Sequence, residues 1–281
     1  MKYIIVIFML LGFICTAGAQ EREPAKNDYI RHIGTGSINW TEGRVHSVGS
    51  SRMQDLEDQE KAARMAERDA LVKARKALLD NLMQLNVDST SRIGDLALQD
   101  PETARKLRAL AHNSQVWETV YYHHPRDKVE VHVFLDLMDH DVQRLLPAAV
   151  FVGPEWRKTG RVAVNVMPYC SMYLDATGLR ASPALVPAFV DRDGNILYKA
   201  SVLGKQPGSR GGHVRYIRVD KDFNITRLYE SGPQGFKVIA EGIDGQLESD
   251  FVLSWEDSLQ LDDIAEGIPD DCPVIIIMGD E

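Results

Sequence analysis

A long segment without glycine or proline most constrains what this chain can fold into. It covers residues 52–86 and is typical of one helix, which at 1.5 Å per residue would extend over roughly 50 Å unless it breaks near Gln59. Its small and apolar residues recur at steps of three and four: Ala63, Ala66, Ala70, Ala74, Ala77, Leu78, Leu82 and Leu85. Because alanine side chains are short, this face predicts a helix lying close against a sheet, with its charged residues in solvent.

Short alternating segments flank this helix. Two strands are expected before it, at residues 29–40 and 43–51, with a turn at residues 41–43. Residues 100–112 predict a second, shorter helix, because Pro101 suits its first position. Residues 115–124 and 128–137 then predict a hairpin, the latter with strict apolar alternation. We therefore expect a β-β-α-α-β-β module over residues 29–147.

The second half is expected to be a separate, β-rich α+β domain over residues 161–281, after a linker at 148–160. A turn at residues 191–195 separates two strands. Ser254 and Asp257 predict a capped helix, and the apolar run at 272–279 predicts a buried last strand. The expected fold class is α+β, with two small modules that each hold a mainly antiparallel sheet with helices packed on one face.

Two prolines mark the most unusual segment of the second half. Pro183 and Pro187 each lack a backbone N–H, so a strand that holds them is expected at a sheet edge or with a bulge. An edge strand of this kind resists self-pairing and leaves carbonyls for a chosen partner. We therefore expect an interaction segment that includes Asp175, Gly178, Leu179 and both prolines. A calcium loop at residues 191–195 is disfavoured, because the glutamate that such a loop needs is absent.

The N-terminus has the pattern of a secretory signal peptide at residues 1–19. Lys2 precedes an apolar run, and small residues at 17–19 suit cleavage before Gln20, followed by a polar leader at 20–28. A lipoprotein signal through Cys15 is disfavoured because the bulky Ile14 precedes it. The apolar run is short for a membrane span, so the mature protein is expected in the periplasm and not across a membrane.

The net charge bears on which partners the protein can bind, and the cysteine content bears on whether it forms a disulfide bond. Loss of Lys2 with the signal peptide changes the net charge from −9 to −10, which disfavours nucleic acid as a partner. Cys170 and Cys272 remain in the mature chain, and two interpretations stay open for them: a disulfide bond in an oxidising compartment, or two buried thiols.

The histidines do not form a recognisable catalytic or metal motif. His123 and His124 are neighbours on an expected strand and point to opposite faces, so they cannot chelate one ion together. His132 could share a face with one of them across the hairpin, while His140 follows the sheet. Because no hydrolase or metalloprotease motif is present either, we expect no catalytic residues, no cofactor and no metal.

The first module resembles a family of bacterial envelope proteins. The motifs are Gly34-Thr35-Gly36, the Ala63–Ala66 step, Arg68-Asp69-Ala70 and Ala74, within residues 33–137. They are similar to the family typified by the twenty-kilodalton lipoprotein and the N-terminal domain of the flagellar H-ring protein FlgT. Membrane anchoring does not carry over, because the lipobox cysteine is missing.

The second module resembles the tail domain of periplasmic relatives of that family. The residues that fit its frame are Tyr173, Leu174, Asp175-Ala176, Gly178-Leu179, Pro183, Pro187, Gly194 and Tyr198. Thr177 stands where these relatives carry an arginine, and the resemblance implies no catalytic residues.

Together these features favour a non-catalytic, exported protein of the bacterial cell envelope. The resemblance implies a structural or assembly role through contacts with other envelope proteins or with further copies of the chain, and flagellar ring assembly is one version of it. Two alternatives remain: a periplasmic ligand-binding protein with a cleft between its two domains, and a secreted hydrolase of an unrecognised type.

Overall fold

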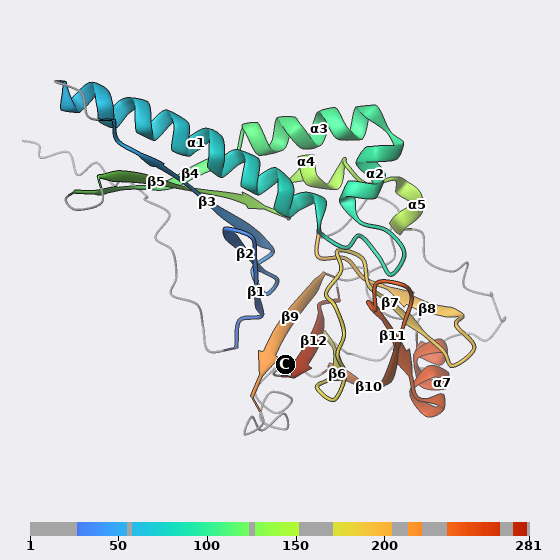
Figure 1. Ribbon diagram of the computed structural model, residues 1–281. Helices are drawn as coiled ribbons and strands as arrows, with labels where there is room; N and C mark the ends of the chain where they lie inside the picture. The colour runs from blue at the N-terminus through green and yellow to red at the C-terminus, as the bar shows by residue number, and fades with distance from the viewer. Residues whose placement is uncertain are drawn as a thin grey trace, which may run out of the picture.

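The computed structural model describes residues 27–54, 58–123, 127–151, 171–203, 213–220, 235–264 and 272–279. These residues form two sheets with helices, so the expected α+β class with two modules is confirmed (Figure 1). The expected signal peptide, most of the leader and linker, and Cys170 lie outside the described residues.

The first module contains a five-stranded sheet in the order β1-β2-β3-β5-β4, in which every pair is antiparallel. Its elements are β1 (Ile30–Ile33), β2 (Gly36–Asn39), β3 (Arg44–Arg52), α1 (Gln59–Met83), α2 (Ile93–Gln99), α3 (Pro101–His112), β4 (Gln115–Tyr122), β5 (Lys128–Asp136), α4 (His140–Gln143) and α5 (Ala148–Phe151). The expected first strand is in fact two, because Gly34 adopts a φ of +52° and turns the chain between them. A further helix, α2, precedes the one that begins at Pro101.

Helix α1 lies close against the sheet, as its alanine spacing predicts (Figure 1). It begins at Gln59, at the expected break, because β3 extends to Arg52 and Asp58 caps the helix by accepting from the Lys61 N–H. The buried stripe is Ala62, Ala66, Ala70, Ala74, Leu78 and Leu82. Ala62 is buried where Ala63 was expected, and Ala63 and Ala77 are only half-buried. A Cβ on Gly49 of β3 would lie 2.1 Å from the Ala70 carbonyl oxygen, so glycine and alanine together set the distance between helix and sheet.

The second module contains a seven-stranded sheet in the order β8-β7-β11-β10-β6-β12-β9. Its elements are β6 (Ser171–Ala176), β7 (Ala188–Val190), β8 (Ile196–Lys199), β9 (Val214–Val219), β10 (Gly235–Asp244), β11 (Asp250–Leu253), α7 (Trp255–Ile264) and β12 (Val274–Gly279). One detail of the expectation is wrong: this sheet is mixed, and four of its pairs are parallel. The parallel pairs join strands that are distant in sequence, so no tight hairpin fixes their direction.

The start of α7 follows half of the expected capping pattern. The Asp257 N–H donates to Ser254 Oγ at 3.0 Å, as in a capping box. The Asp257 carboxylate instead accepts from the Ile239 N–H of β10 at 3.0 Å. The cap therefore also ties the helix to the sheet.

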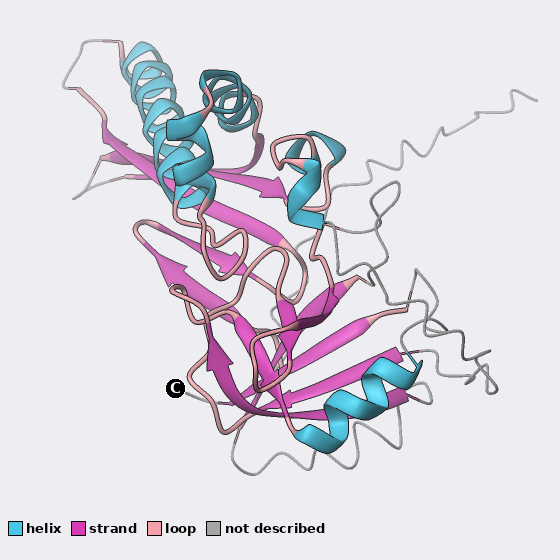
Figure 2. Cartoon of the chain, turned by 90° about the vertical axis from the view of Figure 1, so that its right-hand side faces the viewer, coloured by secondary structure: helices cyan, strands magenta, loops and turns pink. Residues whose placement is uncertain are grey.

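One apolar core runs through both modules. It joins Leu78 of α1 to Leu185, Tyr216 and Ile276 of the second module. Figure 2 shows the helices of the first module on one face of its sheet, and α7 beside the second sheet. Among the described residues, no helix has the length and apolarity needed to cross a membrane.

Candidate functional site

The expected interaction segment does not form an edge strand. Asp175 belongs to β6, which lies between β10 and β12 inside the sheet. Gly178 is exposed and Leu179 half-buried, in the turn after β6. Pro183 and Pro187 are buried in a loop that precedes β7. The loop accommodates the missing N–H groups without any strand, so the assignment of this segment to an exposed edge is wrong.

This segment packs against the first module instead. The Leu185 N–H donates to the Asn86 carbonyl at 2.9 Å, and the Val186 N–H donates to the Val87 carbonyl at 2.8 Å. The Asn86 side chain in turn donates to the Pro183 carbonyl at 3.3 Å. The prolines therefore lie at a contact between the two modules, and the partner of this segment is the chain itself.

The structure brings together a pair of histidines that the sequence pattern did not indicate. His46 Nε2 of β3 lies 3.1 Å from His132 Nδ1 of β5, within hydrogen-bond distance. His132 does not pair with His123, because the register places Lys128 opposite Tyr122 and leaves His123 beyond the end of β4. Alternation along the two strands puts His46 and His132 on one face only because β3 and β5 pair in this register, which the sequence did not show.

A β-bulge adds a tryptophan to this pair. The register of β4 against β5 shifts between Val116 and Glu118, so Trp117 is the extra residue. Its ring packs edge-on against His46 and His132, with centroids 5.6 and 6.3 Å apart. Strand alternation alone could not reveal this placement, because a bulge turns two successive side chains to the same face.

These three residues lie on the sheet face that α1 does not cover, which we call the open face. The opposite face carries Ser47, which accepts from Asn81 of α1, and Gly49, which contacts Ala70 and Ala74. Alternation therefore turns His46 and its even-numbered neighbours away from the helix. The register of β3, β5 and β4 places on the open face Arg44, His46, Val48, Ser50, Arg52, Trp117, Glu118, Val120, Tyr122, Lys128, Glu130, His132 and Phe134.

The open face combines aromatic rings with charges. The Arg44 guanidinium lies 5.0 Å from the Phe134 ring centroid, and the Lys128 ammonium lies 4.6 Å from that of Tyr122. Lys128 also pairs with Glu130 at 2.6 Å, which lowers the pKa of that carboxyl. Burial, with a smaller contribution from the charge of His132, lowers the pKa of His46. His46 is therefore favoured in its neutral form, which can share a hydrogen bond with His132.

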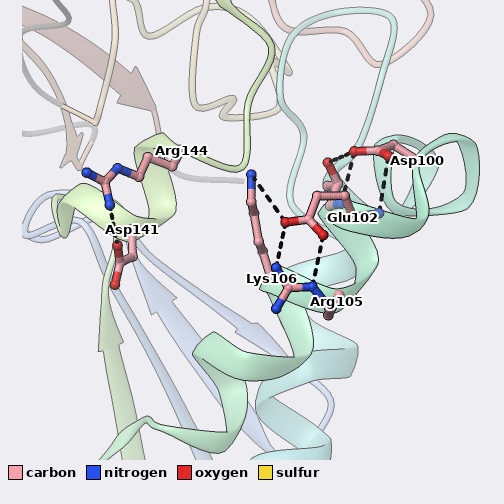
Figure 3. A network of polar contacts seen from close by, with 7 residues as sticks. Asp100, Glu102, Arg105, Lys106, Asp141 and Arg144 are labelled. Atoms are coloured by element: carbon pink, nitrogen blue, oxygen red, sulfur yellow. Dashed lines mark hydrogen bonds and ion pairs between the residues drawn. The ribbon is translucent and has the colours of Figure 1, made fainter.

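A pocket of about 320 Å³ lies near one end of this sheet, lined by residues of α3, α4 and the β4 and β5 ends. Figure 3 shows Arg105 and Lys106 on α3, and Asp141 and Arg144 on α4 across from them. Ser114, which follows α3, also lines this pocket and is 4 % exposed. The pocket belongs to the first module, whereas the expected cleft lay between the two domains.

The described residues show neither a metal site nor a disulfide bond. Within them, no group of three or more His, Cys, Asp or Glu residues is placed to hold a metal ion. Cys272 is buried beside β12. Cys170 lies outside the described residues, so a bond between the two cysteines stays a prediction.

Comparison with known proteins finds a match in each module. Residues 34–140 match the family model of the N-terminal domain of Treponema pallidum Tp0624. Residues 171–280 match the family model of the second domain of the same protein. A search of the curated proteins gives no match. The chain is therefore similar to Tp0624 over both of its modules, in the same order.

Proposed function

We propose that this protein is a non-catalytic, exported component of the bacterial cell envelope that acts by binding other envelope proteins. The pattern of residues 1–19 supports export to the periplasm. The resemblance to envelope proteins of the lipoprotein and FlgT group supports an assembly role, with flagellar ring assembly as its narrower form.

The open face is the observation that carries this proposal. Trp, Tyr and Arg supply most of the binding energy at protein interfaces, and the open face presents Trp117, Tyr122 and Arg44. Trp117 and Arg44 are half-buried, and Tyr122 is 39 % exposed. A β-bulge holds Trp117 in place, so little conformational entropy is lost when a partner covers it.

The second observation is the rigid connection of the two modules. A shared apolar core and backbone hydrogen bonds at Asn86 and Val87 hold them together. Such a connection suits a protein that presents one surface at a fixed angle to another. It disfavours a binding protein that closes two domains around a ligand.

Quantitative co-purification tests the proposal. The tagged mature chain is crosslinked in cells and isolated from the envelope fraction, and its partners are measured by mass spectrometry. We expect Trp117→Ala to reduce recovery of a stoichiometric envelope partner at least tenfold, because a central interface tryptophan contributes about 2 kcal/mol or more. Trp255→Ala is the matched control, since Trp255 of α7 is 60 % exposed and lies in the other module.

Equal recovery of every partner from wild type and Trp117→Ala would contradict a role for the open face. Basal-body proteins among the partners lost by Trp117→Ala would support the flagellar form. Loss of other envelope proteins would support binding to the cell envelope without a role in the flagellum.

A further inference from the structure

The pocket beside α3 has a balanced set of charges. Its cationic residues are Arg105, Lys106 and Arg144, and its acidic residues are Asp136, Asp139 and Asp141. Three positive and three negative charges give a formal net charge of zero. Leu110 and Leu135 add apolar surface. A ligand with a single charge would leave one half of this lining without a complement.

Two of the cations are loosely held. Arg105 forms a bidentate pair with Glu102, at 2.9 and 2.6 Å (Figure 3). Lys106 Nζ lies 3.9 Å from Glu102 Oε1, and Arg144 lies 3.5 Å from Asp141 Oδ1. Ion pairs at such distances on an exposed surface are weak, so these two side chains can turn to a bound anion at little cost.

The acids at the end of β5 are fixed by the backbone. Asp136 Oδ1 accepts from the Met138 N–H at 2.8 Å, and Asp139 Oδ1 accepts from the Asp141 N–H at 2.9 Å. These bonds orient both carboxylates in the turn between β5 and α4. Each carboxylate has a second oxygen that can accept from an ammonium group.

Ser114 provides an independent indication of a ligand. Its Oγ is buried and has no hydrogen-bond partner among the residues that the structure describes. Burying a hydroxyl without a partner is unfavourable, and such groups call for an explanation. Ser114 also borders the pocket, and a polar ligand that reaches its Oγ would supply the missing partner.

We infer that this pocket binds a small zwitterion of dipeptide size. Lys106 and Arg144 bind its carboxylate, Asp136 and Asp139 bind its ammonium group, and Leu110 and Leu135 contact its aliphatic part. The volume of about 320 Å³ is at the small end of the range for ligand pockets, which suits a dipeptide. This inference does not rest on the assembly role of the open face.

Binding measurements with three matched probes test the inference. The full mature chain is titrated with L-alanyl-L-alanine, with propionate and with propylamine, and amide chemical shifts are followed by NMR. We expect the dipeptide to bind at least about tenfold more tightly than either singly charged probe, because each charge-assisted hydrogen bond contributes to affinity. The shifts should centre on α3 and α4.

Single substitutions in the pocket test which residues bind the dipeptide. Lys106→Gln and Arg144→Gln should each weaken dipeptide binding about tenfold, and Ser114→Ala should weaken it about fivefold. Lys73→Gln on α1, which removes a lysine paired with Asp69, should leave binding unchanged. The amide spectrum of each free variant shows whether the fold is intact. Propionate or propylamine binding as tightly as the dipeptide, dipeptide binding unchanged in all three pocket variants, or no binding of any probe would overturn the inference.

Discussion

The two sheets of this protein are built in different ways. In the first sheet, hairpins and one helix-spanning connection join the antiparallel strands, and burial alternates along β5. In the second sheet, β6 pairs in parallel with β10 and β12, which lie far along the chain. The central strands β6 and β12 are buried along most of their length. The central strands of the second sheet are therefore covered on both faces, whereas the even-numbered side chains of β3 and β5 in the first sheet stay half-exposed on the face turned away from α1.

Because the central strands of the second sheet are covered, we expect a cavity to cost more stability there than at the edge of the same sheet. Ile276 of β12 is fully buried between β6 and β9. Ile276→Ala should lower the free energy of unfolding by about 4 kcal/mol, because the packed surroundings cannot collapse into the space. Urea denaturation measures this, with Ile196→Ala as the control, since Ile196 at the sheet edge is 38 % exposed. Equal losses in the two variants would contradict the contrast between centre and edge.

In the first sheet, the sensitive feature is the close approach of α1. Gly49→Ala would place a Cβ 2.1 Å from the Ala70 carbonyl oxygen and 2.2 Å from the Ala74 nitrogen. We expect a loss of about 3 kcal/mol, because the helix must move away from β3. Gly178→Ala is the control, since nothing lies within 4 Å of the added atom. Wild-type stability of Gly49→Ala in a denaturant titration would show that α1 is not tightly packed.

One buried tyrosine hydroxyl of the second module holds the loop that contacts the first module. Tyr216 Oη donates to the Ala184 carbonyl at 2.9 Å and accepts from the Ala184 N–H at 3.1 Å. Tyr216→Phe leaves both backbone groups without this partner and should cost about 2 kcal/mol. Differential scanning calorimetry measures the loss. Tyr122→Phe on the open face removes an exposed hydroxyl bonded to Glu130 and should shift the transition far less. An equal shift in both variants would argue against a special role for Tyr216.

The smallest expected effect is a pH dependence on the open face. Because the folded pKa of His46 is lowered, the unfolded chain binds this proton more readily. Its contribution to stability is complete above the unfolded pKa of about 6.5 and is lost as pH falls through the lower folded pKa. His46→Gln should therefore flatten the stability profile below that pH. Identical profiles for wild type and His46→Gln would refute this role.

The sequence allowed prediction of most local structure, because alternation and alanine spacing reflect which face each residue buries. The strand at residues 128–137, the alanine face of α1 and the turn at residues 191–195 are examples. The parallel pairing of β6 was not predictable, since it depends on contacts between distant segments. Pro183 and Pro187 lack backbone N–H groups, which suggested an edge strand. A buried loop accommodates residues without an N–H equally well, and the structure has such a loop here.

The site was harder to predict than the fold. His46 and His132 meet only because β3 and β5 are neighbours, and the order of strands in the sheet does not follow their order in the chain. The bulge at Trp117 follows from the register of β4 on β5, which no local pattern shows. The buried Ser114 Oγ likewise became visible only through the packing around it.

The most direct test of the account is site-specific photo-crosslinking in cells. A photoreactive residue replaces Val120 on the open face in one variant and Val72, which is 66 % exposed on α1, in the other. Both variants are compared by mass spectrometry of the envelope fraction. We expect a discrete crosslinked envelope protein from position 120 and none from position 72. Crosslinks of equal yield from both positions, or from position 72 alone, would contradict the assignment of the open face as the binding surface.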